Sequence, residues 1–143
     1  MPTPSQPDFT GLWQVNFEKS TILGPAPKRI LMKIEHGEPK LVQKILVTYA
    51  TGQEALLIFT YATTGETANP AGGGTARSRA RCEGTELVIE SSMKTPDREL
   101  HFEDHWSLSG DGGTLTMTHR DDDLAGQISV LEKAPPEAAT MSA

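Results

Sequence analysis

The sequence has little of several features that define other classes of protein. Its only cysteine, Cys82, excludes an internal disulfide and a zinc site built from cysteines. Its apolar stretches fall short of the ~20 residues of a membrane span, and residues 1–7 lack the basic flank and apolar run of a signal peptide. Helical periodicity is almost absent. We therefore expect a helix-poor cytoplasmic protein, or an exported one whose signal peptide has been removed.

Basic residues are also in the minority. The 143 residues include 13 Lys and Arg against 19 Asp and Glu, which gives a net charge of −6. This surplus of acidic residues disfavours a nucleic acid or an anionic membrane surface as the main partner. The length fits one domain that is large enough to bury a core or an internal pocket. We expect that domain over residues 8–133, with an N-terminal arm at 1–7 and a flexible tail at 134–143.

Apolar and polar residues alternate with a period of two along most of the chain, which is typical of β-strands. The candidate strands are 9–17, 29–36, 40–50, 53–62, 75–82, 85–92, 98–109 and 113–120, with a weaker ninth at 126–133. Residues 63–74 are small and read as a flexible connection. Short turns between successive strands make neighbours antiparallel. The sequence predicts an all-β, antiparallel up-and-down meander barrel of 8 to 10 strands, because closure removes open edges; a flattened β-sandwich is the alternative.

The alternation also assigns an inner face to each strand. Several large side chains share that face, and they could line a cavity for a small hydrophobic or aromatic molecule. These candidate ligand-binding residues are Tyr49, Phe59, Tyr61, Phe102, Trp106 and Met117. The alternative is a filled core, in which the same side chains pack against one another.

Segment 75–82 is ambiguous, because Arg77, Arg79 and Arg81 alternate with small residues. If the arginines point outward, they meet Glu86 and Glu90 on the next strand as a surface ladder, and the small residues leave empty volume inside. If they point inward, they form an anion site, because a buried guanidinium needs a partner. The acids on the neighbouring strand favour the outward arrangement.

Two polar residues fall on the predicted inner face. Asp104 lies between Phe102 and Trp106, as a candidate general base or protonated hydrogen-bond donor, or simply as the partner of a buried basic group. His119 on the next strand would lie near it, and the two form the smallest plausible acid–base pair. A haem-binding role for His119 is less favoured, so no cofactor is expected.

On the outer face, His101, Glu103 and His105 have a spacing that a metal could use. A solvated strand surface explains the same pattern, and we expect no metal.

Gly11-Leu12-Trp13 at the start of the first strand and Arg120 at the end of the eighth resemble features of the calycins, the lipocalin and fatty-acid-binding group of barrels. The resemblance implies a lipocalin-like barrel closed at one end by Trp13, with Arg120 packed over its ring as structural barrel closure. The lipocalin cysteines and amphipathic helix are absent, and segment 18–28 is too short for a helical lid. A helix-poor variant, as in avidin-like or nitrobindin-like barrels, fits better.

These features lead to three hypotheses. The first is binding of a small hydrophobic or aromatic ligand inside a lipocalin-like barrel, with its mouth at loops 18–28, 51–52, 83–84 and 110–112. The alternative is a small enzyme on the same barrel that uses Asp104 and/or His119 for general acid/base chemistry on a small hydrophobic substrate. The third is a homodimer, suggested by Leu46, Leu56 and Ile58 on the predicted outer face.

Overall fold

The computed structural model describes residues 8–21, 27–37, 39–71, 74–121 and 127–134. In these residues the chain forms ten strands. They are β1 (Gly11–Val15), β2 (Arg29–Gly37), β3 (Lys40–Thr48), β4 (Glu54–Ala62), β5 (Glu66–Ala71), β6 (Gly74–Glu83), β7 (Glu86–Lys94), β8 (Glu99–Leu108), β9 (Thr114–Asp121) and β10 (Gln127–Lys133). The predicted N-terminal arm and residues 135–143 of the predicted tail lie outside the described residues.

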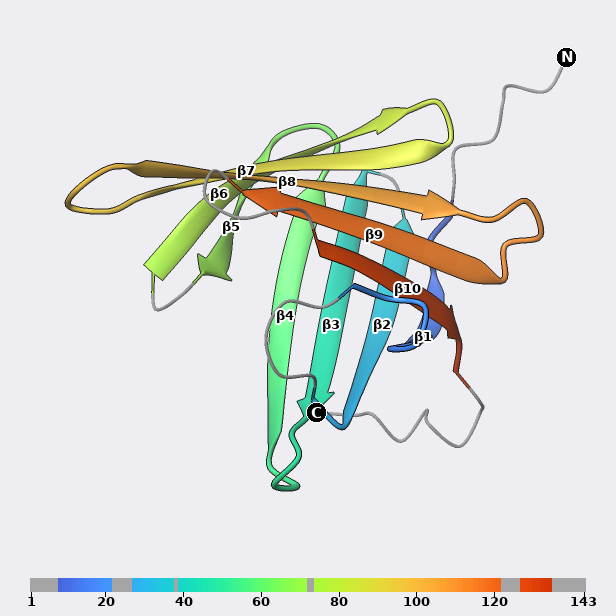
Figure 1. The fold of residues 1–143 in the computed structure, drawn as a ribbon. Helices are drawn as coiled ribbons and strands as arrows, with labels where there is room; N and C mark the ends of the chain where they lie inside the picture. The colour runs from blue at the N-terminus through green and yellow to red at the C-terminus, as the bar shows by residue number, and fades with distance from the viewer. Residues whose placement is uncertain (1–7, 22–26, 38, 72–73, 122–126, 135–143) are drawn as a thin grey trace, which may run out of the picture.

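The ten strands form one antiparallel sheet that curls into a nearly closed barrel. Its order is β4-β3-β2-β1-β10-β9-β8-β7-β6-β5, so every paired neighbour except β1–β10 is consecutive in sequence. Figure 1 shows β2, β3 and β4 running across the direction of β6 to β9, so that the sheet folds over on itself as two crossing layers. The predicted all-β meander barrel is confirmed, with ten strands.

The hairpins have the local chemistry that tight turns need. Glu83 pairs with Glu86, which leaves two residues between β6 and β7, and Gly84 has a φ of 63° there. Gly112 has a φ of 72° in the turn before β9. Glycine adopts such left-handed conformations without the steric cost that a side chain adds, so these turns join antiparallel neighbours directly.

One strand was not expected. Segment 63–74 was predicted to be a flexible connection, but it contains β5, which pairs with β6 from Glu66 to Ala71. This segment has no alternation of apolar and polar residues, so a strand was not predicted there. The inner side of β5 carries Thr67 and Asn69. Because β5 adds one reversal of the chain, every later strand runs in the direction opposite to the predicted one. The turns at 83–84 and 110–112 therefore lie at the other end of the barrel from the turn at 51–52, and the predicted mouth is wrong in this respect.

A dense aromatic core fills one end of the barrel, which we call the closed end. Trp13 is only 1 % exposed, and its indole nitrogen donates a hydrogen bond to the Phe9 carbonyl at 3.0 Å. Trp106 meets Phe9 and Tyr61 edge to face, with ring centroids 5.6 and 6.1 Å apart. Such pairs combine large apolar burial with favourable ring geometry. Trp13 is therefore part of the packed core at this end.

The cation over Trp13 is not the predicted one. Lys133, opposite Trp13 in the β1–β10 pairing, places its Nζ 4.3 Å from the centre of the indole ring. Arg120 instead lies opposite Glu103 in the β8–β9 pairing. The prediction for Arg120 is wrong because β10 separates β9 from β1, and because the added strand β5 places Arg120 toward the opposite end of the barrel.

The barrel is joined differently between its two edge strands, β4 and β5, which lie side by side without ladder pairing among the described residues. Here the side chain of Asn69 makes two hydrogen bonds that a paired strand would otherwise make. The Asn69 carbonyl oxygen accepts a hydrogen bond from the Thr60 backbone nitrogen at 2.7 Å, and the Asn69 amide nitrogen donates to the Thr60 carbonyl at 3.0 Å. We call this junction the seam. It uses the two backbone groups of Thr60 that a neighbouring strand would otherwise satisfy.

Candidate ligand-binding site

A cavity of about 180 Å³ lies inside the barrel, between the seam and the middle of β8. Nine residues from six strands line it. They are Phe59, Tyr61, Asn69, Ala76, Ser78, Ser91, Phe102, Asp104 and His119. A cavity of about 150 Å³ is enough to hold benzene in a protein interior, so this one has room for a small aromatic molecule.

The cavity exists because β6 turns its small residues inward. Ala76 and Ser78 are buried, whereas the arginines that alternate with them are exposed. Small side chains opposite the aromatic rings of β4 and β8 leave the interior unfilled at this point. This confirms the outward placement of the arginines, which was left open by the sequence, and excludes the alternative of an inward arginine anion site.

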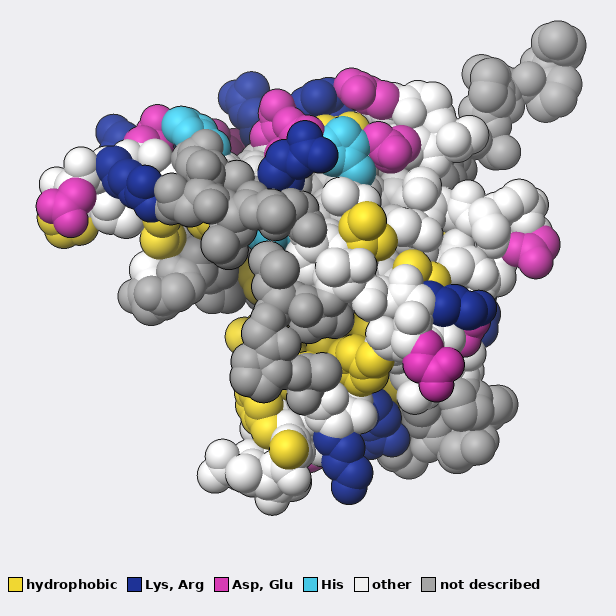
Figure 2. Space-filling model, in the orientation of Figure 1, with side chains coloured by type: hydrophobic (Ala, Val, Ile, Leu, Met, Phe, Trp, Pro, Cys, Tyr) yellow, Lys and Arg dark blue, Asp and Glu magenta, His cyan; other side chains and the backbone are white. Residues whose placement is uncertain are grey.

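The outward arginines pair with acids. Arg81 contacts Glu83 at 3.0 Å and Glu90 at 2.8 Å, and both Arg77 and Arg79 lie within 4 Å of Glu66. Figure 2 shows side chains of both charges gathered over β6, β7 and β8. Each of these pairs is largely exposed, so each contributes little to stability. The expected partner Glu90 is confirmed, whereas Glu86 contacts His105 instead.

Three of the predicted ligand-binding residues line the cavity and three do not. Phe59, Tyr61 and Phe102 line it. Trp106 and Met117 face inward but belong to the packed core. Tyr49 is 45 % exposed, because it lies beyond the end of β3 in the turn before β4.

A chain of polar groups runs along the cavity wall from the seam. The Asn69 amide nitrogen also contacts the Ser78 hydroxyl at 3.2 Å, and that hydroxyl lies 2.8 Å from the Ser91 hydroxyl. Asn69 and Ser78 are almost fully buried, at 5 % and 2 % exposure. Asn69 was not among the predicted site residues, because no strand was predicted there. The one sequence feature that could have indicated it is the alternation of Thr67 and Asn69, which would share one face of a strand.

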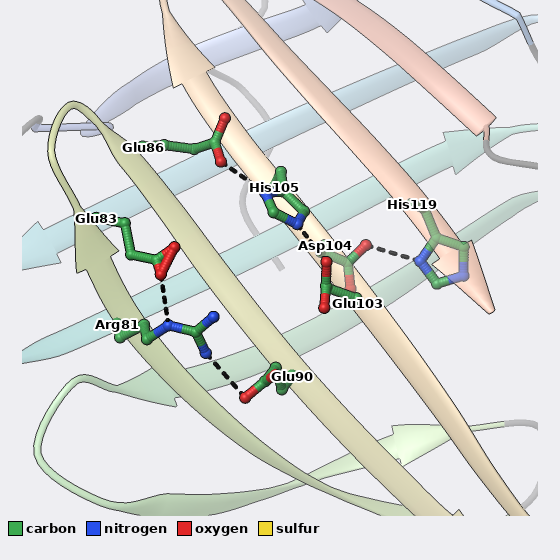
Figure 3. A network of polar contacts seen from close by, with 8 residues as sticks. All are labelled: Arg81, Glu83, Glu86, Glu90, Glu103, Asp104, His105 and His119. Atoms are coloured by element: carbon green, nitrogen blue, oxygen red, sulfur yellow. Dashed lines mark hydrogen bonds and ion pairs between the residues drawn. The ribbon is translucent and has the colours of Figure 1, made fainter. Parts of the chain in front are cut away.

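The opposite wall carries the predicted acid–base pair. Asp104 and His119 face each other across β8 and β9, and His119 Nδ1 lies 2.7 Å from Asp104 Oδ1 (Figure 3). The His119 ring stacks on Phe102 with centroids 5.9 Å apart, which fixes its orientation. Asp104 thus has a basic partner, which was one of the alternatives left open by the sequence. The pair also lies within the cavity, where it can donate or accept a proton.

Tyr61 adds a hydroxyl to the same cavity. Burial raises the pKa of Tyr61 well above its ordinary value, and the negative charge of Asp104 raises it further. The phenol therefore stays protonated and remains a hydrogen-bond donor at any physiological pH.

The outer-face histidines are held by carboxylates. His105 Nδ1 lies 2.6 Å from Glu86 and its Nε2 lies 2.5 Å from Glu103, so the ring bridges two acids (Figure 3). His101 contacts Glu99 instead. Among the described residues no group of three or more His, Cys, Asp or Glu side chains is arranged to hold a metal ion. The bridge raises the pKa of His105, first through the hydrogen bond to Glu103 and then through Glu86.

Comparison of the sequence with family models and with curated proteins finds no match. The described residues also contain no helix with the length and apolar character needed to cross a membrane.

Structural comparison does find similar proteins. A secretory abundant heat soluble protein from Ramazzottius varieornatus is 14 % identical, with a TM-score of 0.67 over 93 % of this chain and 100 % of that one. The wild-type fluorescent protein UnaG is 19 % identical, with a TM-score of 0.62 over 88 % and 97 %. Lipid binding protein 8 of Caenorhabditis elegans is 9 % identical, with a TM-score of 0.63 over 88 % and 95 %. These are calycin-type barrels, and this chain has the calycin-type fold.

Proposed function

We propose that the protein binds a small hydrophobic or aromatic molecule in the cavity beside the seam. The observation that carries this proposal is the cavity itself, where the small inward residues of β6 face the aromatic rings of Phe59, Tyr61 and Phe102. Burial of apolar ligand surface against such rings is favourable, and the few polar groups on the wall can orient the molecule.

The structural neighbours support the same class of ligand. One is called a lipid binding protein, and another, from Manduca sexta, is called a fatty-acid-binding protein, with a TM-score of 0.51 and 15 % identity. The fold alone allows many functions, so the neighbours add to the argument from the cavity and do not replace it.

The test uses an uncharged aromatic probe and an uncharged substitution that reduces the cavity volume. Calorimetry and thermal unfolding with an uncharged aromatic probe, 2-naphthalenemethanol, should show binding to the native chain and a rise in Tm. Ala76→Leu, which places a larger side chain in the cavity, should weaken that binding at least tenfold. Ala68→Leu, at an exposed position of β5, is the matched control and should leave binding unchanged. Equal binding by native chain and A76L, or no binding at all, would contradict the proposal.

A second candidate function is favoured by the pair Asp104–His119. A carboxylate and an imidazole 2.7 Å apart in one cavity could move a proton to or from a small hydrophobic substrate. Asp104→Asn keeps the shape of the side chain but removes the base. If a substrate screen yields turnover, this variant should abolish it while calorimetry still detects the bound substrate. Turnover that persists in D104N would exclude the mechanism.

We also propose self-association through the outer faces of β3 and β4. Leu56 and Ile58 are 37 % and 45 % exposed, and Leu46 lies opposite Leu56 in the pairing. An apolar sheet face of this kind is often covered by a second copy. Sedimentation should show a mass that rises with concentration, and Ile58→Lys should remove that rise.

A further inference from the structure

We propose that the cavity selects uncharged ligands that carry a hydrogen-bonding group, and rejects carboxylates of the same size. This inference rests on the proposed binding function and names the chemical class of its ligand.

Lys and Arg do not reach the cavity. The thirteen Lys and Arg residues of the chain all fall within the described residues, and none is among the nine residues that line the cavity. The three arginines of β6 point outward. Lys133 sits over the Trp13 ring at the closed end. A carboxylate in the cavity would therefore lack the cationic partner that a buried anion needs.

The charge already present in the cavity is unfavourable to an anion. Asp104 is the acidic residue on the wall, and its side chain is 25 % exposed. The basic residue on the wall, His119, already bonds to Asp104. The pair contributes a net charge of zero with a protonated imidazole and −1 with a neutral one. When the imidazole is neutral, Asp104 repels an incoming carboxylate. When the imidazole is protonated, its positive charge is already paired with Asp104.

The negative charge of Asp104 also affects Tyr61, which lines the other side of the cavity. The negative charge of Asp104 disfavours ionisation of the Tyr61 phenol, in addition to the effect of burial. Asp104 therefore acts electrostatically across the interior and does not only serve His119. A second negative group placed between these residues would be disfavoured for the same reason.

The remaining polar groups suit a neutral ligand. The hydroxyls of Ser78 and Ser91 lie 2.8 Å apart, and either can be the donor. A hydroxyl rotates to donate or accept, so this pair can reorganise around an alcohol, amide or ketone. An ammonium group loses much more hydration free energy than a hydroxyl when it leaves water, and the charge of Asp104 is already shared with His119, so an amine is expected to bind less well than an alcohol.

The experiment compares three ligands on one skeleton. Calorimetry at pH 7 uses 2-naphthalenemethanol, 2-naphthoate and 2-naphthylmethylamine with the native full-length chain. We expect the alcohol to bind at least tenfold more tightly than the carboxylate, and more tightly than the amine. This comparison needs no variant, so it stands even if a substitution prevents folding.

One variant and its control test whether the selectivity depends on Asp104. Asp104→Asn should shrink the alcohol-to-carboxylate affinity ratio about tenfold, because it removes the repelling charge. Glu103→Gln is the matched control, since Glu103 is the neighbouring residue on β8 but contacts His105 on the outer face, and it should leave the ratio unchanged.

The outcomes separate this inference from the proposed function. If none of the three ligands binds and A76L changes nothing, the binding function itself fails. If the carboxylate or the amine binds as tightly as the alcohol, binding stands and the selectivity is overturned. An unchanged ratio in D104N would overturn the role given to Asp104.

Discussion

The two halves of the barrel interior have different compositions and different bonding. At the closed end, Phe9, Trp13 and Trp106 pack into a core that is almost entirely buried. Toward the seam, the interior contains hydroxyls, an amide, an imidazole and a carboxylate around open space. Side chains at the closed end contribute mainly apolar burial, whereas those near the seam contribute hydrogen bonds and leave volume.

This difference indicates that stability and binding depend on different parts of the interior, which meet at Tyr61. A packed aromatic core gains free energy from every methylene and ring that it buries. A cavity forgoes part of that gain. The molecule can therefore keep a partly polar cavity because the adjoining aromatic core supplies the packing.

The largest expected effect comes from the closed end. Trp106→Ala removes a ring that is 2 % exposed and that contacts both Phe9 and Tyr61, so it should lower the free energy of unfolding by about 3–5 kcal/mol. Tyr49→Ala, at an exposed position near the other end, should change it by less than about 0.5 kcal/mol. Urea unfolding measures both, and equal losses would contradict the proposed division.

The next effect concerns the seam. Asn69→Ala removes both hydrogen bonds to the Thr60 backbone and leaves a nitrogen and a carbonyl without them, so stability should fall by about 1–3 kcal/mol. Hydrogen exchange of the Thr60 amide should accelerate by more than that of amides in the β2–β3 ladder. Gln53→Ala, at an exposed amide in the turn before β4, is the control. Unchanged exchange at Thr60 would show that the seam does not depend on Asn69.

The smallest effect is a pH dependence on the outer face. The carboxylates raise the pKa of His105 above 6.5, so its stabilisation is complete below that pH and is lost as the pH rises through the raised value. His105 in turn lowers the pKa of Glu103 below 4.5, so that contribution is lost only as the pH falls through the lowered value. The pair therefore stabilises most between about pH 4.5 and 6.5.

His105→Gln tests this window. The variant should lose about 0.2–1 kcal/mol of unfolding free energy at pH 6, because the pair is partly exposed, and almost nothing at pH 9. Ser107→Ala, at the next outward position of β8, should show a difference that does not vary with pH. Thermal unfolding from pH 4 to 9 measures both, and a constant difference for H105Q would contradict the assignment.

The alternation of residues was enough to predict the class of fold. Nine of the ten strands were predicted from alternation with a period of two, and the inner faces of β3, β7, β8 and β9 match that pattern. On β4 the match is partial, because Leu57, which alternation puts on the inner face, is 41 % exposed. Asp104 and His119 could be predicted to meet because a hairpin fixes which residues lie opposite. These features depend on local sequence, which is why they could be read from it.

The remaining features depend on contacts between distant segments. β5 has no apolar alternation, since Asn69 takes the inward place of an apolar residue and bonds to β4. Because β5 was not predicted, the predicted direction of every later strand was the reverse of the observed one. Arg120 and two of the four loops of the predicted mouth were therefore placed at the wrong end of the barrel. Lys133 was missed because only the β1–β10 pairing brings it to Trp13.

The neighbourhood of β1 and β10 has a consequence for how the chain could be rearranged. The Ala134 nitrogen donates to the Leu12 carbonyl at 2.9 Å, so the two ends of the described barrel already adjoin. A short Gly-Ser linker could join them, and new termini could open in the turn at 63–65. Such a circular permutant would begin with β5 and end with β4, which would make the seam the only place where the first and last strands meet.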